Sequence, residues 1–403
     1  MAGMNMKFEH MTTMQSFEVP TIIKHGIGII KHAGDEIKSL GVTKALLVTD
    51  PGIYNAGMTK SVEESLIAAG IEIVLFNQVE ANPPVRVVNE GTKVYKENNC
   101  DGLVAVGGGS SMDTAKAIGV EVAHNGSVLE YEAADGKKPL ENRIPPLTTI
   151  PTTAGTGSEV TQWAVITDEK REFKFNTGGP LIAAHLTIID PELHTSMPPH
   201  ITAMTGIDAL SHAIECYTMK YAQPVTDAVA LMAIEYVANY ARRAYADGAD
   251  IEARYGMAQA AMLAGLSYGS ESAGAAHAMA QTLGGIINVP HGQCVSWMLG
   301  PVMEFNWKGN PERFARVAQA LGINTFQMTT DEAAKAAVNE IYTLVEDLDI
   351  PSLEEQGVPE DMIPRLAEAA MTDPQTIGNP RDLTVQDYEW IYKRCYNLVP
   401  KTL

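Results

Sequence analysis

The segment Gly206–Gly292 contains three motifs whose side chains can bind a divalent metal: GIDALSHAIE at 206–215, HAMAQTLGG at 277–285 and PHG at 290–292. Asp208 and His212 are four residues apart, so a helix places both on one face, about one turn apart. His277 opens a second apolar segment, and His291 follows after a Gly-Gly pair and a proline. These residues form one site only if the fold brings two helices and a loop together.

One carboxylate and three imidazoles form a donor set that suits Fe(II), Zn(II) or a neighbouring first-row ion. Taken singly, each histidine could also be a core or helix-surface residue that binds no metal. Their small, apolar and glycine-flanked surroundings favour a shared site. The cysteines are expected to be reduced core thiols, as in most intracellular proteins. Weaker alternative ligands that lie near the motifs in sequence are His185, His194, His200, Cys216 and Cys294.

The composition is typical of a globular protein, and the chain is longer than one hydrophobic core usually serves. The chain has 403 residues, a hydrophobic fraction of 45% and a formal net charge of −20. Two domains are therefore expected, and the acidity argues against a nucleic-acid partner, since phosphate binding needs clustered Lys and Arg. The Met-rich N-terminus has no apolar run typical of a secretory signal, and no segment approaches the length of a membrane span. We expect a cytoplasmic protein with no membrane partner.

The first half of the chain alternates short apolar strands with helical segments, a pattern typical of a parallel α/β sheet. Strands are expected at 44–49, 71–76, 102–106, 147–150 and 186–190, helices at 58–69, 84–99 and from 113, and a hairpin within 160–176.

Beyond Asp190-Pro191 the periodicity becomes helical. Helices are expected near 200–221, 225–246, 251–268, 273–284, 310–321, 330–347, 360–371 and 386–396. The sequence thus predicts an α/β dinucleotide-binding domain at 1–190 and an all-helical metal and substrate domain at 191–403. Ligand pockets commonly lie between domains, so we expect the active site in a cleft between these two.

A glycine loop, Gly107–Ser111, joins the strand at 102–106 to the following helix. Glycines allow a close backbone approach to an anion, and the free N–H groups of a helix start attract negative charge. The loop lacks the G-x-G-x-x-G fingerprint, and such a turn can also be purely structural. Thr152 and Thr153 follow another strand and could add donors at the same sheet edge.

Asp50 ends the strand at 44–49. A carboxylate there can accept hydrogen bonds from the adenosine ribose and would repel a 2′-phosphate, which favours NAD(H) over NADP(H). The alternative is an aspartate that only forms the turn before Pro51-Gly52.

Taken together, the motifs resemble those of the iron-containing (group III) alcohol dehydrogenases over effectively the full length. The shared motifs, in the family's order, are GGGSSMDTAKA at 107–117, PTTAGTGSEVT at 151–161, GIDALSHAIE, HAMAQTLGG and PHG. The resemblance implies a dinucleotide-binding domain, a helical metal domain and NAD(P)-linked interconversion of small primary alcohols and aldehydes. It also implies a metal, Fe(II) with Zn(II) as the alternative, that acts as a Lewis acid on the alcohol oxygen while hydride passes to the nicotinamide. We also expect a homo-oligomer, a dimer or larger.

Carried over by motif, the metal ligands are Asp208, His212, His277 and His291. The cofactor pyrophosphate falls on Gly108, Gly109 and Ser110, and the further cofactor contacts that the resemblance suggests are Asp50, Asn82, Thr152, Thr153 and Lys174.

Gln281 departs from the family pattern, because relatives commonly have a second histidine four residues after the first in this motif. That histidine is thought to lie near the nicotinamide and relay protons. Glutamine can orient a water or the substrate, but it cannot take up a proton at neutral pH. The proton path is therefore expected to differ here.

Three alternatives stay open at this point. The nearest is a zinc or iron dehydrogenase acting on a polyol, a hydroxy acid or a semialdehyde. A metal-dependent hydrolase or lyase without redox chemistry is more distant, and the strand–GGGS–helix loop argues against it. A non-catalytic helical scaffold would require exposed apolar faces.

Overall fold

The computed structural model describes residues 14–134, 136–268, 273–287 and 289–396. They form two compact units. The first is Val19–Met197, and the second is Pro198–Leu403 together with the described residues that precede Val19.

The first unit is built on a parallel sheet of six strands, as the alternating pattern predicts. In spatial order these are β1 (Ile22–His25), β8 (Leu186–Ile189), β5 (Leu147–Pro151), β4 (Gly102–Gly107), β2 (Lys44–Val48) and β3 (Glu72–Phe76). An antiparallel hairpin, β6 (Trp163–Asp168) and β7 (Phe173–Gly178), stands apart from this sheet.

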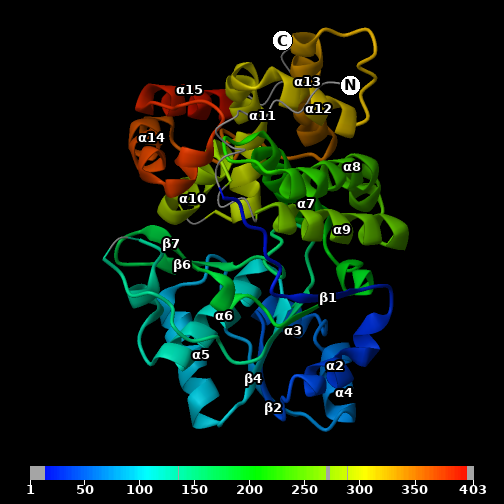
Figure 1. Cartoon of the computed structure of the whole chain (residues 1–403), viewed down its shortest axis with the longest axis vertical. Coiled ribbons are helices and arrows are strands. Elements are labelled where there is room, and N and C mark those ends of the chain that lie inside the picture. Colours follow the sequence, from blue (N-terminus) through cyan, green and yellow to red (C-terminus); the bar gives the residue numbers. More distant parts are fainter. Residues whose placement is uncertain (1–13, 135, 269–272, 288, 397–403) are drawn as a thin grey trace. The chain divides into compact units, whose positions relative to one another are not determined.

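Both faces of the sheet are buried, which is why its strands read as continuous apolar runs instead of alternating ones. Ala45 and Leu47 of β2 pack with η1 (Ile29–His32), α2 (Ala33–Ser39) and α4 (Lys60–Ala68). Leu46 and Val48 pack with α5 (Val85–Glu97) and α6 (Gly109–His124) on the other face. Figure 1 shows these two helical layers on opposite sides of the strands.

The strand order reverses between β2 and β4. The chain runs from β2 outward to β3, then crosses back to β4 and continues through β5 to β8. In open α/β sheets the carboxyl ends of the strands at such a reversal form the ligand crevice. Asp50 follows β2 and Gly108 follows β4, so both lie at this reversal.

The second unit is helical in its described residues. Its α-helices are α7 (Pro199–Thr218), α8 (Pro224–Ala246), α9 (Ile251–Ser267), α10 (Ala275–Ile287), α11 (His291–Asn306), α12 (Pro311–Ala320), α13 (Thr330–Asp347), α14 (Ile363–Thr372) and α15 (Val385–Cys395). Helices α7, α8 and α9 lie side by side. An apolar core joins α10 and α11 to α14 and α15.

The predicted fold class, an α/β domain with a parallel sheet followed by an all-helical domain, is confirmed. The expected strands and helices are present with ends that differ by a few residues. Among the strands and α-helices of the described residues, four were not predicted: β1, α2, the short α3 (Pro51–Asn55) and α11.

The position of His291 differs from the expectation of a loop. His291 is the first residue of α11, with Pro290 as its N-cap residue. A proline before the first turn is compatible with a helix start, while Pro301 inside α11 obscures the helical pattern of the sequence.

The expected division at Asp190-Pro191 precedes the end of the first unit at Met197. Asp190 is fully buried and accepts hydrogen bonds from Gly28 N at 3.0 Å and Ile30 N at 2.9 Å. These bonds tie the chain after β8 to the segment after β1, and η4 (Pro191–His194) stays with the first unit. No helix in the described part of the chain has the length and apolar character that a membrane crossing needs.

Candidate metal and cofactor sites

The four metal-ligand candidates converge from three helices of the second unit. Asp208 and His212 lie on α7, His277 lies on α10 and His291 begins α11. Asp208 Oδ1 is 4.0 Å from His212 Nδ1, 3.7 Å from His277 Nε2 and 3.9 Å from His291 Nε2. These separations exceed hydrogen-bond lengths and leave space for a shared ion.

Donor atoms of Asp208, His277 and His291 all lie within 4.8 Å of one another. His212 is outside that mutual group, but its ring centroid is only 4.2 Å from that of His277. Three buried atoms here lack a hydrogen-bond partner among the described residues: Asp208 Oδ1, His212 Nδ1 and His277 Nε2. Unpaired buried polar atoms are costly, so this donor set fits a bound divalent cation.

The candidate ligands influence one another's charge states. Burial opposes ionisation of Asp208, but the neighbouring imidazoles outweigh it and lower the pKa of this carboxyl to about 2. Burial, reinforced by repulsion from His277, lowers the pKa of His212 to about 4. Burial also disfavours the charged form of His277, yet its interactions with Asp208 and Glu215 prevail and raise its pKa to about 9. Metal binding would displace that proton.

Glu215 orients His277 and was not predicted from the sequence. Its Oε2 accepts a short hydrogen bond from His277 Nδ1, and its Oε1 accepts from Ala276 N at 2.8 Å. This arrangement leaves His277 Nε2 directed at Asp208, and ligating histidines are commonly held in this way. The spacing Asp208–His212–Glu215 places all three on one face of α7, which is the signal that could have revealed it.

The weaker alternative ligands lie elsewhere or in other roles. His185 accepts from Arg143 Nε at 2.9 Å, and His194 Nε2 pairs with Pro151 O at 3.0 Å, both within the first unit. His200 lies in the exposed first turn of α7. Cys216 and Cys294 are buried, and burial raises the pKa of Cys216 to about 12.

The glycine loop is tightly packed. A Cβ on Gly107 would lie 2.4 Å from Ser111 Oγ, and one on Gly109 would lie 2.8 Å from Thr156 Cγ2. Gly108 is the N-cap residue of α6 and contributes no capping side chain. The loop therefore needs glycine for packing, and it also presents the uncapped N-terminus of a 16-residue helix, a suitable site for a pyrophosphate.

Asp50 has the structural role that the sequence left open as the alternative. It is the N-cap residue of α3, and its Oδ1 accepts from Ile53 N at 3.0 Å. Its other oxygen, Oδ2, points to the glycine loop and lies 3.7 Å from where a Cβ on Gly107 would be. The cap thus occupies one oxygen and leaves Oδ2 beside the loop, so helix capping and the expected ribose contact are compatible roles for Asp50.

Thr152 and Thr153 adjoin the glycine loop. Thr152 N donates to Gly107 O at 3.0 Å, and a Cβ on Gly108 would lie 3.2 Å from Thr153 Oγ1. Buried hydroxyls without a partner among the described residues include those of Thr49, Ser111 and Thr152. These donors fit a polar ligand at the carboxyl edge of the sheet.

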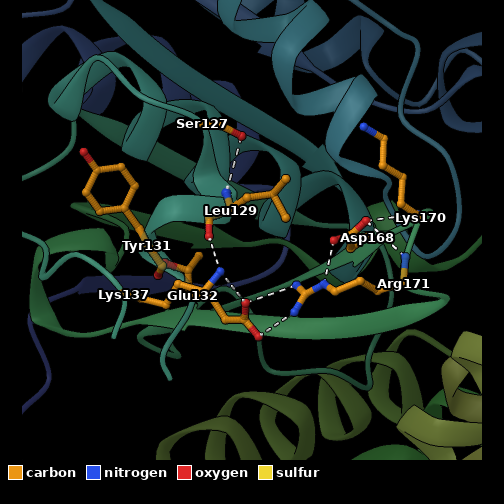
Figure 2. Close-up of polar contacts among 9 residues, drawn as sticks. Ser127, Leu129, Tyr131, Glu132, Lys137, Asp168, Lys170 and Arg171 are labelled. Carbon is orange, nitrogen blue, oxygen red and sulfur yellow. Dashed lines mark hydrogen bonds and ion pairs between the residues drawn. The ribbon is translucent and has the colours of Figure 1, made fainter. Parts of the chain in front are cut away.

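Asn82 and Lys174 are brought together, although they are far apart in sequence. Lys174 Nζ donates to Asn82 Oδ1 at 2.7 Å, and Thr167 Oγ1 donates to Asn82 O at 3.0 Å. The β6–β7 hairpin that carries Lys174 is anchored by Arg171. Figure 2 shows Arg171 bridging Asp168 and Glu132, with Nε–Oδ2 at 2.6 Å and Nη2–Oε2 at 3.1 Å.

Gln281 lies on α10 one turn after His277 and is buried. A side chain four residues along a helix projects from the same face. Its position is therefore on the side of α10 that faces the ligand cluster.

Two family models together match most of the chain. The model described as iron-containing alcohol dehydrogenase matches residues 20–191, and the model for the C-terminal part of the Fe-containing alcohol dehydrogenase family matches residues 202–396. The chain belongs to the iron-containing alcohol dehydrogenase family. The resemblance drawn from the motifs is thereby confirmed.

Relatives and solved structures of this family align over nearly the whole chain. A choline dehydrogenase of Bacillus subtilis is 77% identical over 99% of this chain and 100% of its own length. An NAD-dependent methanol dehydrogenase of Bacillus methanolicus is 40% identical over 94% of this chain and 99% of its own. A crystal structure of 1,3-propanediol oxidoreductase superposes with a TM-score of 0.92 and 38% identity, covering 95% of this chain and 100% of that one.

Membership in this family makes the chain an oxidoreductase that interconverts alcohols and aldehydes with NAD(H). Enzymes of the family use a divalent metal, and the cluster on α7, α10 and α11 offers donors for one.

Proposed function

We propose that this iron-type alcohol dehydrogenase oxidises choline to the corresponding aldehyde, with NAD⁺ as the hydride acceptor. The observation that carries the proposal is the 77% identity to the choline dehydrogenase of Bacillus subtilis over 99% of this chain. Choline is a small primary alcohol, so the proposal refines the substrate class that the motifs predict.

The surroundings of the metal cluster support a cationic substrate. The ring of Tyr268 lies against His212, with centroids 5.5 Å apart, and its hydroxyl donates to Gln375 Oε1 at 2.7 Å. Gln375 N donates in turn to Asp373 Oδ1 at 2.9 Å, and burial raises the pKa of Asp373 to about 7. An aromatic ring recognises a quaternary ammonium group through its π face, so Tyr268 is the proposed contact for the choline headgroup.

Asp208, His212, His277 and His291 would hold the metal, for which we propose Fe(II) before Zn(II). A bound divalent ion supplies Lewis-acid polarisation of the alcohol oxygen. Glu215 holds His277 in place by accepting its Nδ1–H. Metal quantitation after anaerobic purification distinguishes the two ions.

The cofactor would bind at the carboxyl edge of the sheet. Gly108, Gly109 and Ser110 would present the first-turn N–H groups of α6 to the pyrophosphate. Asp50 would accept from the adenosine ribose, and Thr152, Thr153, Asn82 and Lys174 complete the proposed contacts. Residues 1–190 would thus serve the cofactor, and residues 191–403 the metal and substrate.

Gln281 would orient the substrate or a water molecule through its amide. Because an amide takes up no proton at neutral pH, the hydroxyl proton would leave through water or through the cofactor ribose.

A cytoplasmic location and a homo-oligomer complete the proposal, and light scattering after size-exclusion chromatography tests the assembly.

Short uncharged alcohols are the second candidate substrates. The methanol dehydrogenase of Bacillus methanolicus and the 1,3-propanediol dehydrogenase of Citrobacter freundii are 40% and 39% identical to this chain. Their similarity is much lower than that of the choline dehydrogenase, which is why choline is preferred.

The test compares choline with 3,3-dimethylbutan-1-ol, its uncharged isostere, by NADH formation with the Fe(II)-loaded enzyme. We expect kcat/KM for choline to exceed that for the isostere by about tenfold or more, as a cation–π contact would give. Tyr268→Leu should reduce this preference. Equal or higher kcat/KM for the isostere or for methanol and 1,3-propanediol would contradict the choline assignment and leave the second candidates.

A further inference from the structure

The helix that follows the glycine loop contains a buried ammonium group with no place in the chemistry described so far. Lys116 of α6 is fully buried, and its Nζ donates to three backbone carbonyls. These are Ser158 O at 2.7 Å, Thr161 O at 3.1 Å and Trp163 O at 2.7 Å. The hydroxyls of Ser158 and Thr161 lie at 3.0 and 3.3 Å from the same nitrogen.

Asp113 lies just under one turn earlier on α6 and forms hydrogen bonds with the same segment. Its Oδ1 accepts from Ser158 Oγ at 2.6 Å, and its Oδ2 accepts from Val165 N at 3.0 Å. Asp113 and Lys116 therefore bind the chain from Ser158 to Val165 through both its donors and its acceptors. We refer to these two residues as the α6 clamp.

The segment held by the α6 clamp lies in the chain between the threonines beside the glycine loop and the hairpin that carries Lys174. Before it lie Thr153 and Thr156, which pack against Gly108 and Gly109, and Ser158 N donates to Thr156 Oγ1 at 3.2 Å. Strand β6 begins within the segment at Trp163, and Thr167 of that strand donates to Asn82 O. A displacement of the clamped segment would move the turn that contains Thr153 and Thr156, and the β6–β7 hairpin, relative to the glycine loop.

Burying the two charges of the α6 clamp costs free energy, and their hydrogen bonds hold the clamped segment in place. Removal from water lowers the pKa of Lys116 to about 8 and raises that of Asp113, and the two charges partly offset these effects for each other. Buried charges are retained only when they are paired and hydrogen-bonded. An apolar pair of similar size would fill the same space without holding three carbonyls and an amide in fixed positions.

We infer that the α6 clamp is a positioning device for the nicotinamide cofactor, with Lys116 and Asp113 acting through Ser158 and Thr161 and not touching the cofactor themselves. The inference rests on the proposed binding of NAD(H) at the glycine loop. It assigns a role to residues of the GGGSSMDTAKA and PTTAGTGSEVT motifs that phosphate binding alone does not use.

The test measures NADH affinity by fluorescence titration in the absence of alcohol, using the metal-loaded enzyme. Lys116→Met should raise the Kd for NADH about tenfold or more, since a small misplacement of a binding loop has effects of this size. Ser158→Ala, which removes one hydroxyl and keeps the charges, should raise it less. Ser158→Thr restores a hydroxyl and should return the Kd toward that of the wild type.

Thr21→Val is the matched control. Thr21 Oγ1 donates to Ala184 O at 2.9 Å and is also buried in the first unit, but beside β1 and away from the glycine loop. This variant should leave the Kd for NADH unchanged, as a general loss of stability would lower the active fraction without changing affinity. In steady state, the clamp variants should raise KM for NAD⁺ while metal content and KM for the alcohol stay constant.

An unchanged Kd in Ser158→Ala and in folded Lys116→Met would overturn the inference. If Lys116→Met does not fold, Ser158→Ala decides alone. Failure of the wild type to bind NADH would instead contradict the proposed cofactor site, so the two failures are distinguishable.

Discussion

Asp50 has one observed role, as a cap, and one proposed role at the cofactor, and a single substitution can separate them. Its Oδ1 caps α3 through Ile53 N, and its negative charge is proposed to exclude a 2′-phosphate. Asparagine is a comparably good N-cap residue, so Asp50→Asn should keep the turn and lose the charge. We expect the ratio of kcat/KM for NADP⁺ over NAD⁺ to rise about tenfold, equivalent to about 1.4 kcal/mol. An unchanged ratio at unchanged thermal stability would show that Asp50 is only a cap.

Gln281 stands where the resemblance leads us to expect a histidine. Gln281→His would place an imidazole one turn after His277, where it could exchange a proton near neutral pH. We expect the pH profile of kcat to gain a titration that the wild type lacks. Gln281→Leu is the control, because it removes the amide without adding a titrating group. A profile in the histidine variant that matches the wild type would remove this position from the proton path.

Glu159 is expected to make the stability depend on pH. It is buried, and burial raises its pKa from 4.5 to about 7. Between these values the folded protein keeps a proton that the unfolded chain releases, so the free energy of unfolding falls as pH rises through this window. The full effect, present above pH 7, is at most roughly 3 kcal/mol.

Glu159→Gln should remove this dependence. Urea unfolding at several pH values should show the variant gaining stability over the wild type as pH rises toward 7. Parallel profiles for the two proteins would contradict the assignment.

Individual candidate ligands could be proposed from the sequence because their chemistry is local. Asp208 and His212 form an i, i+4 pair, and the glycines form a recognisable turn. Glu215 was missed because a carboxylate on an apolar helix has many roles, and only the fold shows that it meets His277. The contact of Lys174 with Asn82 likewise depends on a hairpin crossing to a distant loop.

At the scale of the element, α7 arranges ligand and support on one face. Asp208, His212 and Glu215 follow the helical repeat, so the helix fixes the orientation of His277 as well as two donors. Glu215→Gln keeps an acceptor for one bond but loses the charge that fixes the imidazole tautomer. Metal affinity should fall about 10- to 100-fold, measured by competition with a chelator.

The matched control for that experiment is Glu304→Gln. Glu304 is also a carboxylate of the second unit, and it accepts from Tyr342 Oη at 3.0 Å in a setting distinct from the ligand cluster. Its replacement should leave metal affinity unchanged. Equal affinity in Glu215→Gln and the wild type would show that Glu215 serves only the N-terminus of α10.

Elements with a strong sequence pattern could be predicted, and those without one could not. The buried strands β2 and β4 are continuous apolar runs, whereas β1 is an edge strand whose residues are mostly exposed. Helix α11 has a proline within it and is buried over most of its length, so it lacks the polar face that marks an amphipathic helix. Its first residue, His291, was therefore assigned to a loop.

At the scale of the whole molecule, the change from alternating strands to continuous helices could be read from the sequence. The return of the described residues before Val19 to the helical unit could not, because it depends on contacts across most of the chain. One such contact joins Gln223 Nε2 to Ser16 O at 3.0 Å. Local periodicity carries no information about such long-range pairing.

The metal should stabilise the second unit as a whole, because its ligands come from three helices that are distant in sequence. Without an ion, Asp208, His212 and His277 retain buried atoms that have no partner among the described residues. A ligand that binds only the folded state at about 100 times its Kd adds about 2.7 kcal/mol. Chelation should therefore lower Tm, and hydrogen exchange should accelerate in peptides from α7, α10 and α11 more than in those from the sheet.

His212→Ala should unfold near the Tm of the chelated wild type and respond little to added Fe(II). Equal Tm and exchange with and without the ion, at confirmed metal occupancy, would show that the cluster is preorganised and that metal binding adds nothing to the fold.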